Sequence, residues 1–278
     1  MGIVPAPPVL PVRRESTTKT ATEMLYPMHV MNVTDFLDRY AGGDRKLESH
    51  QKLKRLGLVA EISKELLTDA EVLFMSHEWT GFTHPDPNGH QTRELCLLLQ
   101  RLRSGAVAKV ESSWEYQLSF KRKDVVEAAE WVQRLEKAYI WLDYICVPQP
   151  NATDDDDVAG DAESTPSLER QATSDARLGA PLNSHLNIPD ENQTTSMRRA
   201  DLAQQCSNAV SSIPAYIEMS TIFMVFAPNT PHANRTEEQG ATVCSVASWR
   251  GRGWCRTEFI GGLLAPRPKY AEMNIAPR

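Results

Sequence analysis

Three short apolar runs, each followed by a segment with helical periodicity, constrain the fold of this 278-residue chain more than any other feature. The apolar runs cover residues 71–76, 139–145 and 221–227. Each run ends abruptly in polar residues or proline, which is typical of strands buried on both faces. Segments with helical spacing cover residues 91–102, 124–135, 197–212 and 253–264. This alternation predicts an α/β fold, a parallel sheet with helices on both faces.

The remainder of the chain is expected to form a lead, an N-terminal segment and an insertion. Residues 1–22 are rich in Pro, Thr, Arg and Lys with little to bury, which is typical of a disordered lead. Residues 23–70 form a predicted helical segment of two or three helices, broken at a Gly-Gly pair. The α/β domain then covers residues 71–278, with an acidic insertion at about 150–195 that we expect to be disordered.

The formal charge of −6 is concentrated in the predicted insertion. Residues 150–195 hold ten acidic and two basic residues, a net of −8, so the rest of the chain carries about +2. A nucleic-acid-binding surface usually needs a basic face or stripe, so nucleic acid is not an expected partner.

Several sequence features indicate a cytoplasmic chain without a membrane partner. The longest apolar stretch, residues 213–228, is interrupted by Pro214 and Glu218 and falls short of the roughly 20 residues that span a bilayer. The N-terminus has no basic region before its apolar residues, as a secretory leader would. Five cysteines, an odd number without a C-x-x-C pair, favour reduced thiols over disulfides or structural zinc.

Polar residues follow the end of every predicted strand. The segments concerned are Ser76 to Trp79 after the first strand, Cys146 to Gln149 after the second, and Arg250 to Glu258 after the third. Ligands of parallel sheets bind outside the carboxyl ends of the strands, so we expect the functional site where these segments converge.

Two of these segments carry a family resemblance. Gly253 to Phe259 is similar to the Ser-x-Trp-Cys-x-x-Glu-Leu segment of Toll/interleukin-receptor (TIR) domains, and residues 72–76 resemble their opening strand. Tyr139 to Gln149 is even closer to the Tyr-x-Trp-Ile-Asp-x-x-Cys-Ile-x-Gln signature of fungal heterokaryon-incompatibility (HET) domains, which are themselves similar to TIR domains. The resemblance covers about residues 71–265 without the insertion.

The resemblance implies a flavodoxin-like sheet and, as in many TIR domains, hydrolysis or cyclisation of NAD by the glutamate that matches Glu258. It also implies activity on self-association and a role in defence or self/non-self signalling. Two departures stand out: the loops after the second and third strands are long, and two further strands are expected after the last helix. Residues 268–276 supply one such strand at most, so either the sheet lacks its last strands or the N-terminal segment completes it differently.

The chemistry of NAD cleavage suits this segment. Nicotinamide leaves as a neutral molecule, so one carboxylate, Glu258, suffices to stabilise the positive charge that develops on the ribose. Trp254 lies one helical turn before Glu258 and can stack on the nicotinamide ring. Arg250, Arg252 and Arg256 lie near the same helix N-terminus, and guanidinium groups suit a pyrophosphate. NAD is thus an expected substrate, and no cofactor is expected.

Simpler structural roles compete with each of these assignments. Trp254 can be a core anchor and Glu258 a solvated or paired helix residue. Ser76 and His77 either bind ribose or phosphate, with Trp79 as a wall of the pocket, or bond to nearby backbone at a turn. Asp143, inside an apolar strand, needs a partner, which leaves open a structural hydrogen bond or a place lining the site.

Other chemistries have weaker support. His77, His84, Asp86 and His90 contain ordinary metal-ligand types, but their spacing matches no known pattern and a turn explains residues 85–89, so no metal is expected. Cys255 as a nucleophile is less favoured than a packing role, although its position near a helix N-terminus can lower a thiol pKa. Neither G-x-G-x-x-G nor a P-loop is present in the sequence.

Two functions therefore compete. One is a TIR/HET-like NAD hydrolase or cyclase with Glu258 as the essential residue. The other is a catalytically inactive TIR/HET-like module that uses the same α/β domain for self-association and protein–protein interaction. A pocket lined by Trp254 and Glu258 and reached by Ser76 and His77 would favour the enzyme.

Overall fold

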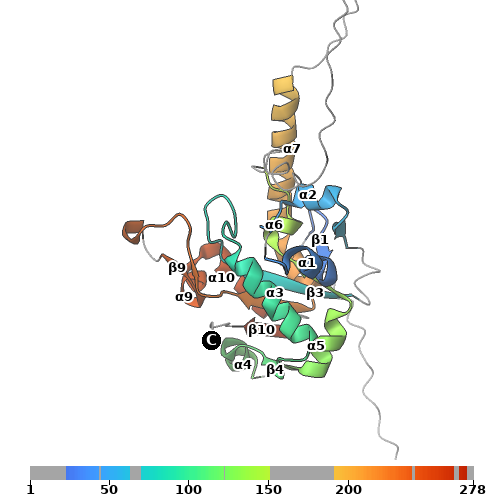
Figure 1. The fold of residues 1–278 in the computed structure, drawn as a ribbon, viewed down its shortest axis with the longest axis vertical. Coiled ribbons are helices and arrows are strands. Elements are labelled where there is room, and N and C mark those ends of the chain that lie inside the picture. The colour runs from blue at the N-terminus through green and yellow to red at the C-terminus, as the bar shows by residue number, and fades with distance from the viewer. Residues whose placement is uncertain are drawn as a thin grey trace, which may run out of the picture.

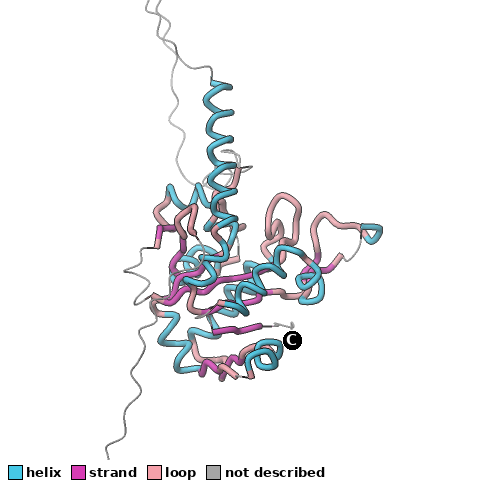
Figure 2. Tube along the Cα trace, turned by 180° about the vertical axis from the view of Figure 1, so that it is seen from behind, coloured by secondary structure: helices cyan, strands magenta, loops and turns pink. Residues whose placement is uncertain are grey.

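The computed structural model describes residues 23–43, 45–62, 70–121, 123–150, 191–239, 242–265 and 269–273. Within these ranges the fold is mixed α/β, with a central six-stranded sheet flanked by helices (Figures 1 and 2). The strand order is β10-β7-β3-β6-β1-β2. The predicted lead and all but the ends of the predicted insertion lie outside the described residues.

Four neighbouring strands of this sheet are parallel, in agreement with the prediction. They are β3 (Glu71–His77), β6 (Ala138–Trp141), β7 (Ile222–Phe226) and β10 (Lys269–Met273). β3 lies between β6 and β7, and its register sets Leu73 opposite Ile140 on one side and Ile222 on the other. Phe74 stacks on Trp141 and on Phe223, so aromatic rings fill the centre of one face.

The second predicted strand is shorter than expected. β6 ends at Trp141, and Asp143 opens a short helix, α6 (Asp143–Cys146), rather than lying inside a strand. The cause is local: one carboxylate oxygen of Asp143 accepts a hydrogen bond from the Tyr144 backbone N–H at 2.6 Å. Short side chains that bond to adjacent backbone favour turns over the strand ladder.

The N-terminal segment was predicted to be helical, and this was only partly correct. It contains the helices α1 (Val33–Tyr40) and α2 (His50–Arg55), but also the strands β1 (His29–Asn32) and β2 (Val59–Glu61). β1 pairs with β6 and β2 with β1, both antiparallel, so the sheet is mixed rather than parallel and the N-terminal segment completes it. Strands of three or four residues are too short to show a period of two in a sequence.

A further correction concerns the predicted helix start at residue 124. Val125–Glu127 forms β5, which pairs antiparallel with β4 (Lys109–Glu111), and helix α5 (Ala128–Leu135) begins only afterwards. Consecutive β-branched residues favour a strand, and the Asp124 backbone N–H is bound by the Ser112 hydroxyl at 3.0 Å. Helix α4 (Trp114–Phe120) connects β4 to β5.

The crossovers determine which face each helix covers. The chain moves from β3 to β6 in one direction along the sheet and from β6 to β7 in the other, so right-handed crossovers place their helices on opposite faces. The first connection holds α3 (His90–Arg103) and α5, which pack together (Figure 1). The second holds α7 (Glu191–Ser211) and α8 (Ile213–Met219), and α8 packs against α10 (Gly253–Leu264) of the β7-to-β10 connection.

The long connection after β7 forms a lobe at one side of the sheet (Figure 1). It contains β8 (Thr230–Pro231), the 3₁₀ turn η3 (Glu237–Gln239), β9 (Val243–Cys244) and α9 (Val246–Gly251). β8 and β9 pair antiparallel, and α9 leads into α10. The lobe thereby brings α9 and the start of α10 to the carboxyl end of β3. Across the described residues, no helix has the length and apolarity needed to cross a membrane.

Candidate functional site

Helix α10 points Glu258 toward the sheet. Glu258 and Gly262 are four residues apart and share a helix face, and both are buried. A Cβ atom at Gly262 would lie 2.9 Å from the Phe223 ring, so only glycine allows the helix to approach β7 this closely. Cys255, on the same buried face, directs its thiol to the His77 carbonyl oxygen at 3.6 Å. The close approach therefore places the carboxyl of Glu258, a residue that is 5% exposed, over the end of β3.

The Glu258 carboxyl is bonded to Ser76. Ser76 Oγ donates to Glu258 Oε2 at 2.5 Å and accepts from Trp249 Nε1 of α9 at 3.1 Å. Burial raises the pKa of Glu258 to about 8, and the charge of Asp143 adds to the rise, whereas hydrogen bonds from Ser76 and Trp254 and the charge of His77 oppose it. A carboxyl with such a pKa is largely protonated at pH 7.

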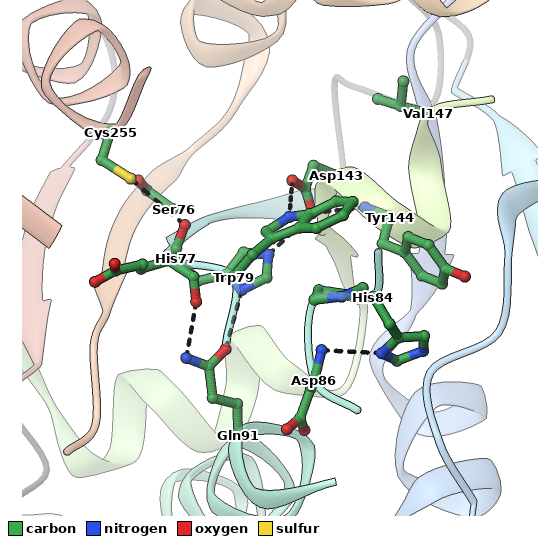
Figure 3. Close-up of polar contacts among 12 residues, drawn as sticks. Ser76, His77, Trp79, His84, Asp86, Gln91, Asp143, Tyr144, Val147 and Cys255 are labelled. Carbon is green, nitrogen blue, oxygen red and sulfur yellow. Dashed lines mark hydrogen bonds and ion pairs between the residues drawn. The ribbon is translucent and has the colours of Figure 1, made fainter. Parts of the chain in front are cut away.

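His77 occupies the other face of the sheet, because successive residues of a strand point to opposite faces. While Ser76 faces α10, His77 Nδ1 lies 3.1 Å from Gln91 Oε1 of α3, and His77 Nε2 lies 2.9 Å from Asp143 Oδ1 (Figure 3). Burial favours the neutral ring, but the Asp143 carboxylate and the Gln91 hydrogen bond raise the pKa of His77 above its ordinary value.

Asp143 connects the ends of β3 and β6. Besides His77 and the Tyr144 backbone, it accepts from Trp79 Nε1 at 2.7 Å (Figure 3). Burial alone would raise the pKa of Asp143, but its bonds to His77, Trp79 and the backbone lower it. Asp143 therefore has both roles left open by the sequence: it is hydrogen-bonded to structural partners and it lies among the candidate site residues.

A second group of charges lies beside the first, around Glu78. The Glu78 side chain is 1% exposed and accepts from Ser248 Oγ at 2.5 Å and from Arg252 Nε at 2.9 Å. Arg235 Nη1 lies 3.6 Å from the same carboxylate. Arg252 also reaches the Trp79 carbonyl oxygen at 3.5 Å, which links this group to Asp143 through Trp79. Arg252 is thus part of an ion pair in this structure.

The structure divides the seven predicted site residues between two hydrogen-bonded groups at the carboxyl end of β3. Ser76, Glu258 and Trp254 form the first group, in which Trp254 is 46% exposed and bonds to Glu258. His77, Asp143, Trp79 and Arg252 form the second, and the charges of His77 and Asp143 act on Glu258. The other arginines of this segment lie apart: Arg250 pairs with Glu115 of α4, and Arg256 is exposed.

Four partners of these two groups were not predicted: Gln91, Arg235, Ser248 and Trp249. Gln91 lies in the first turn of the helix after the first strand, at the correct edge of the sheet, so its place in the topology was an available signal. Trp249 and Ser248 contact residues 170 or more positions away, and no local pattern indicates such pairs.

The alternative chemistries find no support in the geometry. His84 Nε2 bonds to the Leu47 carbonyl oxygen and Asp86 accepts from Thr92, so both belong to turn and cap structures. Among the described residues, no three His, Cys, Asp or Glu side chains converge as metal ligands would. Burial raises the pKa of the Cys255 thiol to about 12, which makes it a poor nucleophile at neutral pH.

Two cavities in the described part of the chain lie elsewhere. One of about 90 Å³ is lined by the start of α3 and the loop at 228–231, and one of about 320 Å³ lies between α1 and the end of α3. Neither is lined by Ser76, His77, Trp254 or Glu258. Glu258 is 5% exposed in this conformation and bonds to the half-exposed Trp254. Neither cavity is the pocket over Glu258 that would favour the enzyme, and Ser76 and His77 face opposite sides of the sheet.

Compared with protein-family models, with curated proteins and with solved structures, the chain matches none.

Proposed function

We propose that this chain is a TIR/HET-like signalling domain with a flavodoxin-like core that cleaves the nicotinamide–ribose bond of NAD, with Glu258 as the essential residue. One observation carries the proposal: a buried carboxyl at the carboxyl end of β3, bonded to Ser76 at 2.5 Å, has a pKa raised to about 8. Strongly shifted carboxyls on this edge of an α/β sheet are typical of functional sites. As a signalling domain it would act in the cytoplasm.

The proposed reaction needs an ionised Glu258. The C1′–N bond breaks, its electron pair leaves with nicotinamide, and water adds to C1′ in hydrolysis with loss of a proton. A carboxylate beside the ribose stabilises the positive charge of this transition state. The pyridinium charge of bound NAD would itself lower the pKa of Glu258 and favour the ionised form. The half-exposure of Trp254 and its bond to Glu258 support a role in which its indole would stack on the nicotinamide ring.

The test follows nicotinamide release from NAD by the purified chain over a range of protein concentrations. We expect Glu258→Gln to lower the rate at least about 100-fold, because the developing charge loses its counter-charge. The matched control is Glu136→Gln, an exposed carboxyl at the end of α5, which should leave the rate unchanged. No nicotinamide release at any concentration, or full activity in Glu258→Gln, would refute the proposal.

The pH profile is a second test of the same role. Since the pKa of Glu258 is about 8, the rate in the wild type should rise with pH and level off above that value at low NAD concentration. A rate that falls as the pH rises from 6 to 8 would assign the essential step to a protonated group instead.

A second candidate function, self-association without catalysis, has its own observation. The outer face of α10 exposes two apolar side chains one turn apart, Ile260 at 52% and Leu264 at 74%. Together with an enclosed Glu258, this fits a helix that contacts a second copy of the chain. Sedimentation should then show concentration-dependent association that Ile260→Asp with Leu264→Asp abolishes, while Leu118→Asp, equally exposed on α4, has no effect. A monomer at all concentrations contradicts this candidate.

A further inference from the structure

We propose that Gln91 is a positioning residue that holds His77 as an imidazolium ion, and that this ion is the fixed positive charge of the site. The inference rests on the proposed function only where it concerns turnover of NAD. The protonation state of His77, with which it begins, does not depend on any reaction.

The orientation of the Gln91 amide decides the state of one ring nitrogen. Gln91 Nε2 donates to the Glu78 carbonyl oxygen at 2.9 Å. A carbonyl oxygen only accepts, so the amide nitrogen must be on that side and Oε1 must face His77. Oε1 lies 3.1 Å from His77 Nδ1 and is also only an acceptor, so Nδ1 carries a proton (Figure 3).

Asp143 decides the state of the other ring nitrogen. His77 Nε2 is 2.9 Å from Asp143 Oδ1, and the same carboxyl accepts from Trp79 Nε1 and from the Tyr144 backbone N–H. A carboxyl that accepts from several N–H groups is stabilised in its ionised form. An ionised carboxylate has no proton to donate to the ring, so Nε2 also carries a proton, and His77 is an imidazolium ion.

The surroundings of His77 agree with this assignment. The groups that face its ring are Asp143 of α6 and Gln91 of α3. Both favour the charged ring, and together they outweigh burial and raise the pKa of His77; Glu258 of α10 adds to the rise only where it is ionised. The Cys255 thiol lies 3.6 Å from the backbone oxygen of His77.

The consequence for the site concerns Glu258. The positive charge of His77 lowers the pKa of Glu258, against burial and Asp143, which raise it. Without Gln91 the ring loses an acceptor for Nδ1–H and gives up its proton more readily. Gln91 would therefore set, through His77, the pH at which Glu258 ionises, although it belongs to the opposite face of the sheet.

The experiment is nitrogen-15 NMR of the histidine rings in the wild type, Gln91→Met and Gln117→Met, with His77→Gln used to assign the signal among seven histidines. Gln117 is the matched control, since its amide also donates to a backbone oxygen, that of Ser112 at 2.6 Å. We expect both ring nitrogens of His77 to be protonated at pH 7.5 in the wild type and in Gln117→Met. In Gln91→Met the midpoint of the His77 titration should fall by roughly one pH unit, which corresponds to the free energy of one hydrogen bond.

A single protonated nitrogen in the wild type at pH 7.5 overturns the proposal, even if Gln91→Met does not fold. An unchanged midpoint in a folded Gln91→Met also overturns it. If NAD is cleaved, the alkaline rise of the rate in Gln91→Met should move to higher pH, with Gln117→Met unchanged. Absence of NAD cleavage together with a doubly protonated His77 would refute the proposed function and leave this assignment standing.

Discussion

His50 and His77 are both buried, at 2% and 8% exposure, yet their pKa values are shifted in opposite directions. His50 Nδ1 faces the Ile145 carbonyl oxygen at 3.2 Å, and the ring packs edge-on against His29. Among the described residues, Nε2 of His50 has no hydrogen-bond partner. Burial, with His29 and Lys54 adding to it, lowers the pKa of His50 to about 3. The pKa of His77 is raised. Burial is common to both, so their neighbours account for the difference: Asp143, with Gln91, at His77, and His29 and Lys54 at His50.

The carboxyl groups of the same two regions repeat the contrast. Burial would raise the pKa of Glu48, near α1 and α2, but bonds to Arg39 and Lys52 lower it. Glu258 is bonded to a hydroxyl and an indole instead, and its pKa is raised to about 8. The N-terminal segment thus pairs its half-buried carboxylate with cations. At the carboxyl edge of the sheet Glu78 is paired with Arg252 in the same way, whereas the side chains bonded to Glu258 are uncharged and its raised pKa is characteristic of functional sites.

The largest expected effect comes from removing the partner of His77. Asp143→Asn leaves a buried imidazolium without its counter-charge, so the free energy of unfolding at pH 7 should fall by about 3–5 kcal/mol, the typical cost of breaking a buried pair. Urea unfolding measures it, with the exposed Asp38→Asn as a control that should stay within about 0.5 kcal/mol. A loss below about 1 kcal/mol would mean that His77 is neutral in the folded protein.

The second prediction concerns the pH dependence that Glu258 imposes. Its folded pKa of about 8 lies above the unfolded value of 4.5, so its contribution to stability is full at low pH and is lost as the pH rises through 8. Between pH 5 and pH 8 the wild type should lose about 3 kcal/mol relative to Glu258→Gln, which cannot titrate. Parallel stability curves for the two proteins, measured by urea unfolding at several pH values, would contradict the raised pKa.

The contrast between these regions also separates what the sequence could predict from what it could not. The parallel strands β3 and β7 were predicted because each is a continuous apolar run, and helices α3 and α10 because each spans enough residues to show helical spacing. β1, β2 and β5 have three or four residues, and there the register with a neighbouring strand, rather than local pattern, decides the structure.

The same limit applies to the site. Ser76, His77 and Glu258 could be placed at one edge of the sheet because parallel strands end together. The protonation of His77 could not be predicted, since it depends on hydrogen bonds to Gln91 and Asp143, which belong to two other elements. A side chain's partner 66 or 182 residues away, as for His77 with Asp143 or Ser76 with Glu258, leaves no trace in local composition.

A third prediction tests His50, the other half of the comparison. Its folded pKa of about 3 lies below the unfolded value of 6.5, so stability is lost as the pH falls below 6.5. The wild type should lose about 2 kcal/mol between pH 7 and pH 5 relative to His50→Gln. The exposed His90→Gln should keep the wild-type slope. If His50→Gln keeps that slope as well, the acid sensitivity of the protein arises elsewhere.

The smallest effect is expected at Glu48, where the buried charge is paired on both sides and partly hydrated. Arg39 Nη2 donates to Glu48 Oε1 at 2.8 Å, and Lys52 Nζ lies 3.1 Å from the same atom. Glu48→Gln keeps an acceptor for both cations, whose own side chains reach water, so urea unfolding at pH 7 should show a loss of about 1 kcal/mol. Because the folded pKa of Glu48 is lowered, the difference from wild type should shrink as the pH falls through that pKa. A loss of stability in Glu48→Gln as large as that in Asp143→Asn would contradict the comparison. It would mean that the charges of the N-terminal segment are as strongly coupled as those at the carboxyl edge of the sheet.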